Sequence, residues 1–332
     1  MYDVDIRHEV LQVGRFPEAM QRLLDAEFVP VSLEALERNP AVGARIRAIV
    51  TRSDHAVPAE LIERLPALGL IATLGVGYDR IPVDFAASRG VVVTHTPNVL
   101  NAAVAELTLG LMLSVLRRLP QSDRYVREGR WRQGPFPLAT GLAGKRVGIV
   151  GLGRIGKAIA RCVEPFGAAV AYCGRTDQGL PWAYHADVHA LAVASDVLVL
   201  VAPATAQTER MIDASVLRAL GPSGYLINVA RGSLVDQAAL IEALTNGGIA
   251  GAALDVFDNE PDIDSRFLSL DNVVLTPHVG SATHETRQAM ARLTLDNLHA
   301  FFQGEPLPTP VPTATAASTR SVPGASGTQH PA

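Results

Sequence analysis

The sequence predicts an α/β protein of two domains, in which a Rossmann-type doubly wound sheet is inserted into a second parallel α/β domain. Short apolar segments alternate with helical patterns along most of the 332 residues, which is typical of parallel sheets. A glycine-rich turn, Gly151-x-Gly153-x-x-Gly156, follows an apolar strand in the middle of the chain. Because this turn opens a dinucleotide-binding fold, the residues before it must form another domain.

The N-terminal part of the chain contains four predicted strands followed by a long apolar helix. The strands are expected at residues 10–13, 48–51, 70–74 and 91–94. Residues 102–116 contain Glu106 as their one charge, so we expect a buried helix at the first crossing between domains.

The C-terminal part continues the alternation and then changes composition. Further strands are expected at residues 168–172, 197–201, 225–229, 250–255 and 273–275, and a helix at 285–302 should return the chain to the first domain. We therefore expect one domain at 1–101 and 285–308 and the other at 102–284. Residues 309–332 are rich in Pro, Thr, Ala, Ser and Gly and are predicted to be a disordered tail.

Charge and composition exclude several classes of partner. The net charge of -4 and the pI of about 6.1 provide no basic field for nucleic acid or an anionic membrane. No apolar run approaches the roughly 18 residues of a membrane span, and no signal peptide is evident, so a cytoplasmic protein is expected. Cys162 and Cys173 lack metal-ligand spacing, so both are expected to be reduced and no metal is expected.

The glycine turn explains how a dinucleotide could bind. Gly151 permits the tight turn, Gly153 lets the backbone approach a pyrophosphate, and Gly156 lets the next helix pack closely. Arg154 and Ile155 lie in the same turn, at a helix N-terminus that attracts phosphate charge.

The end of the next strand indicates which dinucleotide is preferred. An NAD site usually has a carboxylate there for the ribose 2′-hydroxyl, but this chain reads Cys173-Gly174-Arg175-Thr176. Arg175 and Thr176 would instead bind a 2′-phosphate, so NADPH is the preferred cofactor and NADH the alternative. Asp177 is a rival NAD ligand, which we expect to face solvent.

Three polar residues follow successive strands of the second domain: Arg231, Glu260 and His278. Each alone could be a surface, turn or loop-ordering residue, but the carboxyl ends of parallel strands meet at one edge, where ligands bind. An arginine can hold a carboxylate, a histidine can transfer a proton, and a neighbouring glutamate favours the charged histidine. These are the parts of a 2-oxo acid reductase.

Several motifs resemble the D-isomer-specific 2-hydroxyacid dehydrogenases over about residues 45–310. They are the glycine turn, Asn228-Val229-Ala230-Arg231-Gly232, Leu254-Asp255-Val256-Phe257 leading to Glu260-Pro261, and Thr276-Pro277-His278-Val279-Gly280. The branch that it resembles most comprises the glyoxylate, hydroxypyruvate and hydroxyphenylpyruvate reductases, because of Phe136-Pro137-Leu138, Gly144-Lys145-Arg146-Val147 and residues 277–287. This resemblance implies a flavodoxin-like substrate domain around the inserted Rossmann domain.

The resemblance also implies roles for individual residues. Arg231 would clamp the substrate carboxylate, His278 would protonate the carbonyl oxygen and Glu260 would orient His278. The amides of Val76 and Gly77, from the other domain, would cradle the carboxylate. The nicotinamide end of the cofactor would contact Val201, Ala202, Pro203, Val229, Ala230, Arg231, Asp255, His278 and Gly280. Trp131 would either reach the substrate site of a neighbouring subunit in a homodimer or only pack in the dimer.

The activity implied is NADPH-dependent reduction of glyoxylate and hydroxypyruvate to D-2-hydroxy acids. Reduction of aromatic pyruvates or 2-ketogluconate is an open alternative. NAD-dependent oxidation of phosphite or formate is another. A dinucleotide-sensing protein similar to a transcriptional corepressor, which binds without turnover, is a third.

Overall fold

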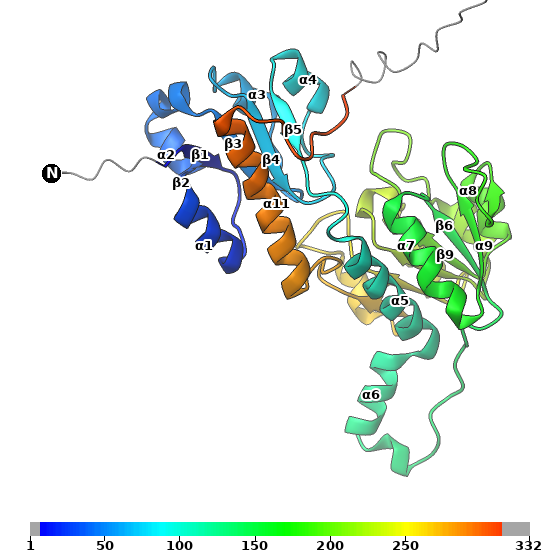
Figure 1. Ribbon diagram of the computed structural model, residues 1–332. Coiled ribbons are helices and arrows are strands. Elements are labelled where there is room, and N and C mark those ends of the chain that lie inside the picture. The colour runs from blue at the N-terminus through cyan, green and yellow to red at the C-terminus, as the bar shows by residue number, and fades with distance from the viewer. Residues whose placement is uncertain (1–6, 314–332) are drawn as a thin grey trace, which may run out of the picture. The chain divides into compact units, whose positions relative to one another are not determined.

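The chain folds into two compact units, each built on its own parallel sheet. The structure is a computed structural model that describes residues 7–313 (Figure 1). The first unit runs up to Pro97 and resumes at Arg287, and the second comprises Asn98–Thr286. The sequence had suggested boundaries at residues 101 and 284.

The first unit contains five parallel strands in the order β2-β1-β3-β4-β5, which is the flavodoxin-like order. Its strands are β1 (Glu9–Gln12), β2 (Val29–Ser32), β3 (Ala48–Arg52), β4 (Leu70–Leu74) and β5 (Val92–Thr94). Its helices are α1 (Glu18–Glu27), α2 (Leu33–Arg38), η1 (Pro40–Arg45), α3 (Ala59–Glu63), α4 (Val83–Ser88) and most of α11 (His284–Gln303).

Strand β2 was not predicted from the sequence. It pairs with β1 at the edge of the sheet, contains Pro30 and has no fully buried residue. Proline cannot donate a hydrogen bond to a neighbouring strand, so it is tolerated only at a sheet edge. The edge strand β2 also lacks the buried apolar run that identifies β3 and β4.

Residues 309–311, which we call the C-terminal strap, lie along the other edge of this sheet. The Val311 amide donates to the Val93 carbonyl at 2.8 Å, and Pro310 bridges Thr94 in antiparallel orientation. Val311 is buried in the core of the unit. The expectation of disorder from residue 309 is therefore wrong for the strap, because main-chain pairing and the burial of one valine outweigh its composition. The rest of the predicted tail, from residue 314, lies outside the described residues.

The second unit contains seven parallel strands in the order β12-β11-β10-β9-β6-β7-β8, the order of a doubly wound dinucleotide-binding sheet. Its strands are β6 (Arg146–Val150), β7 (Ala169–Cys173), β8 (Ala183–His185), β9 (Val197–Leu200), β10 (Tyr225–Asn228), β11 (Gly251–Leu254) and β12 (Val273–Leu275). Its helices are α5 (Asn101–Arg117), α6 (Leu119–Arg127), η2 (Arg130–Arg132), α7 (Arg154–Val163), η3 (Glu164–Phe166), α8 (Val188–Val193), α9 (Ala214–Leu220), η4 (Gly232–Leu234), α10 (Gln237–Thr245) and η5 (Ser265–Ser269). The predicted fold class is thus confirmed.

The direction of winding reverses between β6 and β9. From β6 the chain proceeds to β7 and β8 on one side, and from β9 to β12 on the other. In open parallel sheets, ligands bind outside the carboxyl ends of the strands at such a reversal. A ligand site is therefore expected on the loops that follow these strands.

Helices α5 and α6 differ sharply in their surroundings. The apolar α5 packs against α7 and against β10, β11 and β12, which accounts for its eight buried residues. Helix α6 has no buried residue, and with the segment that follows it extends away from the rest of the second unit (Figure 1). None of the helices in the described part of the chain is both long enough and apolar enough to cross a membrane.

Candidate active site

The glycine turn after β6 lies at the reversal of the sheet. Gly151 has φ +97°, and a Cβ there would lie 2.7 Å from the Ala202 Cα atom on the loop after β9. A Cβ on Gly156 would lie 2.3 Å from the Gly151 oxygen, so neither position admits a side chain. A Cβ on Gly153 would have no neighbour within 4 Å. This space beside the main chain, at the N-terminus of α7, fits a phosphate group that must approach the backbone.

The loop after β7 presents a cationic and a hydroxyl side chain to solvent. Arg175 and Thr176 are exposed, and neither forms a hydrogen bond or ion pair with the described residues. Asp177 is also exposed, but its carboxylate accepts hydrogen bonds from the Tyr172 hydroxyl at 2.7 Å and the Gly179 amide at 3.0 Å. These bonds lower the pKa of Asp177. The Oδ1 atom of Asp177 is therefore occupied within its own loop.

Asn228, the last residue of β10, shapes the loop that carries Arg231. Its buried side chain donates from Nδ2 to the Arg231 carbonyl at 2.9 Å and accepts from the Ala230 amide at 3.0 Å. The Nη1 atom of Arg231 donates to the Ala230 carbonyl at 2.9 Å. Asn228 was not predicted to have a role, although a polar residue at the end of the apolar run of β10 was a signal.

Gly232 brings the loops after β10 and β11 into contact. A Cβ at this position would lie 2.0 Å from the Phe257 carbonyl carbon and 2.2 Å from the Asp258 nitrogen. Only glycine allows this approach, and it joins the Arg231 loop to the loop that carries Glu260.

Asp255, at the end of β11, organises the loop after β12. Its Oδ1 atom accepts from the Thr276 hydroxyl at 2.6 Å and the Val279 amide at 2.8 Å, and its Oδ2 atom accepts from the Gly280 amide at 2.8 Å. Burial raises the pKa of Asp255, against the opposing effect of these hydrogen bonds. This residue fixes the course of the chain on both sides of His278.

His278 has a left-handed backbone, with φ +53°. Its amide donates to the Asp255 carbonyl at 2.9 Å, which helps to hold this uncommon conformation in place. The Nδ1 atom of its ring lies 2.7 Å from Oε2 of Glu260, and the two side chains are 36% and 26% exposed. The histidine and the glutamate therefore form a hydrogen-bonded pair that is accessible to a small molecule.

The position of Glu260 is also fixed, because its Oε1 atom accepts from the Phe257 amide at 2.9 Å. Burial by itself would raise the pKa of Glu260, but hydrogen bonds from His278 and Phe257, with the charges of His278 and Arg231, lower it below its ordinary value. Glu260 thus faces His278 as a carboxylate.

The second unit therefore carries most of the predicted site residues on loops after the strands of one sheet. The glycine turn follows β6, Gly174 to Thr176 follow β7, Val201 to Pro203 follow β9, Val229 to Arg231 follow β10, Asp255 and Glu260 follow β11, and His278 and Gly280 follow β12. Trp131 lies apart from them, in η2, where it is 68% exposed.

Val76 and Gly77 belong to the first unit, where they follow the carboxyl end of β4. Within the described residues, neither of their amide N–H groups donates a hydrogen bond. Two adjacent amides without acceptors can bind a carboxylate oxygen.

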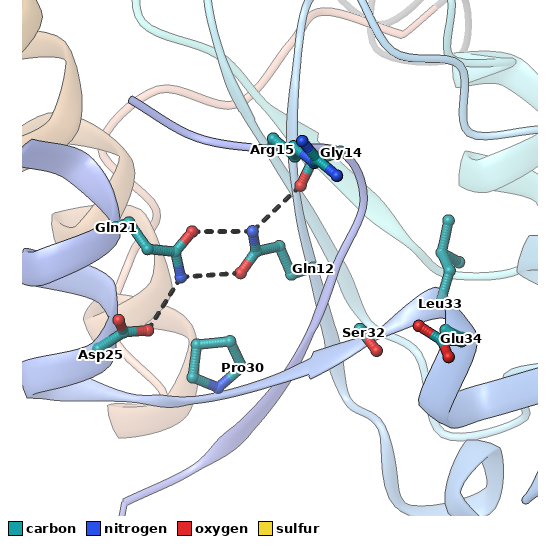
Figure 2. Close-up of a pocket in the computed structure, with 9 residues that line it drawn as sticks. All are labelled: Gln12, Gly14, Arg15, Gln21, Asp25, Pro30, Ser32, Leu33 and Glu34. Atoms are coloured by element: carbon teal, nitrogen blue, oxygen red, sulfur yellow. Dashed lines mark hydrogen bonds between the residues drawn. The ribbon is translucent and has the colours of Figure 1, made fainter. Parts of the chain in front are cut away.

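A separate hollow of about 460 Å³ lies at the carboxyl ends of β1 and β2 in the first unit. Figure 2 shows that the Gln12 and Gln21 amides face each other across it, bonded reciprocally at 2.9 and 3.0 Å. Gln12 also donates to the Gly14 carbonyl and Gln21 to Asp25. None of the predicted site residues lines this hollow, so it is not the candidate active site.

Comparison with known proteins agrees with the geometry of the second unit. Residues 109–280 match the family model of the NAD binding domain of D-isomer specific 2-hydroxyacid dehydrogenases. A glyoxylate/hydroxypyruvate reductase A of Arabidopsis thaliana is 48% identical over 267 residues, which cover 80% of this chain and 85% of that protein.

Two further relatives extend the likeness to nearly the whole chain. A 2-ketogluconate reductase of Gluconobacter oxydans is 42% identical over 91% of this chain and 98% of its own length. The crystal structure of an NADPH-dependent glyoxylate/hydroxypyruvate reductase from Sinorhizobium meliloti, in complex with NADP and malonate, has a TM-score of 0.86 and 45% identity, covering 93% of this chain and 98% of that one. The chain therefore belongs to the D-isomer specific 2-hydroxyacid dehydrogenases, a family of NAD(P)-dependent oxidoreductases.

Proposed function

We propose that the protein is an NADPH-preferring reductase of small 2-oxo acids, with glyoxylate and hydroxypyruvate as its first substrates and D-2-hydroxy acids as its products. The observation that carries the proposal is the His278–Glu260 pair, at 2.7 Å, on the sheet edge that also carries the Arg231 loop and the glycine turn. The names of the relatives in Arabidopsis and Sinorhizobium support this choice of substrates.

The His278 ring would transfer the proton through its outer nitrogen. Since Nδ1 is bonded to Glu260, Nε2 is the atom left to protonate the carbonyl oxygen of the substrate. Glu260 orients the ring through this bond. Arg231 would hold the substrate carboxylate through its guanidinium group, and the free amides of Val76 and Gly77 would bind the same group. When bound, the dinucleotide supplies the hydride to the carbonyl carbon.

The second unit has two places that could hold the cofactor: the space beside Gly153 and the exposed side chains of Arg175 and Thr176. The amides around Gly153, Arg154 and Ile155 would bind the pyrophosphate. Arg175 and Thr176 would bind the 2′-phosphate, while Tyr172 and the Gly179 amide hold the Oδ1 atom of Asp177 within its own loop. The proposed preference for NADPH over NADH rests on this arrangement.

Steady-state kinetics with a panel of 2-oxo acids tests the proposal. Glyoxylate, hydroxypyruvate, phenylpyruvate and 2-ketogluconate are each assayed with NADPH and NADH. We expect the highest kcat/KM with NADPH and one of the first two acids. The Gluconobacter relative covers nearly the whole chain, so 2-ketogluconate is the second candidate. Tight NADPH binding without turnover of any acid would refute a reductase and favour a dinucleotide sensor.

The His278→Ala variant tests the mechanism within the same assay. Removing a general acid typically lowers kcat by about 10² to 10⁴-fold, whereas NADPH affinity, measured by cofactor fluorescence, should be retained. Arg231→Ala should mainly raise KM for the acid. Near-normal turnover by His278→Ala would contradict the proposed proton donor.

We also propose that the protein is a homodimer in which residues 119–138 contact the second copy. This segment exposes four large apolar side chains: Leu119, Val126, Trp131 and Leu138, the last of them 100% exposed. Helix α6, which lies in this segment, has no buried residue. Large apolar side chains exposed on one segment typically mark an interface.

Light scattering after size-exclusion chromatography tests the dimer. Val126→Glu combined with Leu138→Glu should yield a monomer, while Leu268→Glu, a control at a 69% exposed leucine outside this segment, should not. Trp131→Ala separates two roles of the tryptophan. A raised KM in an intact dimer indicates that the ring reaches the partner's substrate site. A weakened dimer with an unchanged KM indicates that the ring only packs in the dimer. A wild type that is monomeric at micromolar concentration would refute the proposal.

A cytoplasmic location is proposed from the state of the cysteines. Cys162 and Cys173 are both free, and burial raises the pKa of the Cys173 thiol, which keeps it protonated. Free thiols persist in reducing compartments. Cell fractionation with an antibody against the protein would check the location, and recovery in a membrane or extracellular fraction would contradict it.

A further inference from the structure

The loop at the end of β4 holds two peptide units in defined orientations. Gly75 has φ +152°, and a Cβ there would lie 2.4 Å from the Ser53 hydroxyl oxygen, so the turn requires glycine. The Gly75 amide donates to the buried Thr96 hydroxyl at 3.1 Å, and the Thr96 amide donates to the Gly75 carbonyl at 2.8 Å. We call residues 75–77 the carboxylate cradle, in keeping with the proposed function of Val76 and Gly77.

A trans peptide unit couples each carbonyl to the next amide, because the C=O and the N–H lie in one plane and point in opposite directions. The Thr96 amide, by holding the Gly75 carbonyl, therefore fixes the direction of the Val76 N–H. His95 does the same for the next unit: its Nδ1 atom lies 3.0 Å from the Val76 carbonyl, so it fixes the direction of the Gly77 N–H. Both donors of the cradle are thus aimed from two consecutive residues that follow β5.

His95 is itself held by the C-terminal strap. The His95 amide donates to the Thr309 carbonyl at 3.2 Å, and the Thr309 hydroxyl donates to the His95 carbonyl at 2.6 Å. The Tyr78 ring also packs against the imidazole in a T-shaped arrangement, with the ring centroids 5.5 Å apart. The two bonds fix the main chain of His95, and the contact with Tyr78 restrains its ring.

The strap is anchored in turn by helix α11. The buried Asn297 side chain donates to the Thr309 hydroxyl at 2.9 Å and accepts from the Thr309 amide at 3.2 Å. Its Nδ2 atom also donates to the Leu293 carbonyl at 2.7 Å. Continuous polar contacts therefore lead from α11 through Thr309 and His95 to the Val76 carbonyl.

We propose that His95 and Thr309 are positioning residues for substrate capture: His95, held by Thr309, aims the Gly77 amide at the carboxylate of the 2-oxo acid, beside the Val76 amide that Thr96 directs. The inference rests on the proposed function, in which those amides bind the substrate. It adds that the carboxyl-terminal end of the fold, distant in sequence from every catalytic residue, controls the affinity of the enzyme for its substrate.

Substitutions at His95 test the aiming of the Gly77 amide. His95→Ala removes the donor and frees the peptide unit, and the loss of one such bond should raise KM for glyoxylate about fivefold to tenfold. The inhibition constant of oxamate, a carboxylate analogue that cannot be reduced, should rise by the same factor. The kcat at saturation and the dissociation constant of NADPH should stay within about twofold of the wild type. His95→Asn, whose Nδ2 atom can replace the Nδ1 donor, should restore both constants.

Thr309→Val tests the strap while leaving the imidazole in place. It removes the hydroxyl shared by His95 and Asn297 and should raise KM and the oxamate inhibition constant about threefold. Thr294→Val is the matched control, because that buried hydroxyl on α11 donates only to the Met290 carbonyl. The control should lower the melting temperature to a similar extent without changing either constant.

The outcomes separate this proposal from the proposed function. Turnover with unchanged constants in both His95→Ala and Thr309→Val would overturn the positioning role and leave the reductase intact. An equal rise of KM in Thr294→Val would overturn it too, since general destabilisation would then explain the effect. A wild type without turnover of any 2-oxo acid would overturn the reductase and this proposal together. If His95→Ala does not fold, the comparison of Thr309→Val with Thr294→Val decides.

Discussion

At the scale of single residues, the pKa of Glu260 lies below its ordinary value although burial alone would raise it. His278 donates to one carboxylate oxygen and the Phe257 amide to the other, and together they overcome the cost of desolvation. The same two bonds fix the His278 ring, whose backbone is already held in a left-handed conformation by Asp255. Charge and orientation therefore depend on one small set of contacts.

Replacing this charge should change the pH dependence of stability. Because folding lowers the pKa of Glu260 from 4.5, its ionised form stabilises the protein above about pH 4.5, and this contribution is lost as the pH falls below that value. The melting temperature of Glu260→Gln should therefore lie below that of the wild type near pH 7, and the difference should shrink in acid.

Glu260→Gln should also lower kcat/KM for reduction. A glutamine has one acceptor oxygen where the carboxylate has two, so it cannot accept from both the His278 ring and the Phe257 amide, and the ring is held less firmly. We expect a fall in kcat/KM with little change in the dissociation constant of NADPH. A kcat/KM equal to that of the wild type would remove Glu260 from this role.

Arg175 provides the second prediction at this scale. In Arg175→Ala the proposed charge-assisted contact with the 2′-phosphate is lost, which costs about 1.5 to 3 kcal/mol, or roughly tenfold or more in NADPH affinity. NADH lacks that phosphate, so its affinity should change little. Titration of cofactor fluorescence measures both. Equal weakening of the two cofactors, or a wild type that prefers NADH, would contradict the assignment.

At the scale of elements, the contact between the loops after β10 and β11 depends on Gly232. Gly232→Ala places a methyl group 2.0 Å from the Phe257 carbonyl carbon, so one of the loops must move. We expect a loss of about 1–3 kcal/mol of stability and at least a tenfold fall in kcat, because Glu260 lies on the displaced loop.

Gly110→Ala is the matched control for this substitution. Gly110 is exposed on α5, and a Cβ there would have no neighbour within 4 Å. The change should stabilise the helix by about 0.5–1 kcal/mol and leave kcat unaltered. Chemical denaturation and steady-state kinetics measure both effects, and normal kcat in Gly232→Ala would show that the loops do not need this contact.

Elements with strong periodic or apolar patterns could be predicted from the sequence. The strands that became β3, β4, β9, β10 and β12 were placed within one residue of their ends, because their apolar runs are buried on both faces. The short edge strands β2 and β8 and the unburied helix α6 were missed, since edges and projecting helices have no such run.

The site could be predicted only in part. The order of strands put Arg231, Glu260 and His278 on one edge, and the structure adds the 2.7 Å contact between the last two. The roles of Asn228 and His95 could not be foreseen, because each depends on which way a loop peptide points. No pattern of residue types encodes that direction.

At the scale of the whole molecule, the groups of the proposed site come from two parallel sheets of different strand order. The second unit has the glycine turn, the proton donor and the guanidinium group, whereas the first has the two free amides. The first unit is built from two separate stretches of the chain, and the second stretch provides α11 and the strap. Its sheet is therefore completed only after the chain has passed through the second unit.

The C-terminal strap has a further consequence, for the solubility of the protein. It occupies the outer side of β5, where the Val93 carbonyl would otherwise be an unpaired acceptor on an open sheet edge. Open edges recruit strands from other molecules, and β5 is short but apolar. A chain ending at residue 308 should therefore self-associate at micromolar concentration, as measured by light scattering, whereas one ending at residue 313 should behave like the full chain. If both truncated chains stay equally dispersed, the strap does not protect the edge. If only the shorter chain self-associates, a purification tag should be placed after residue 313 and should not replace the strap.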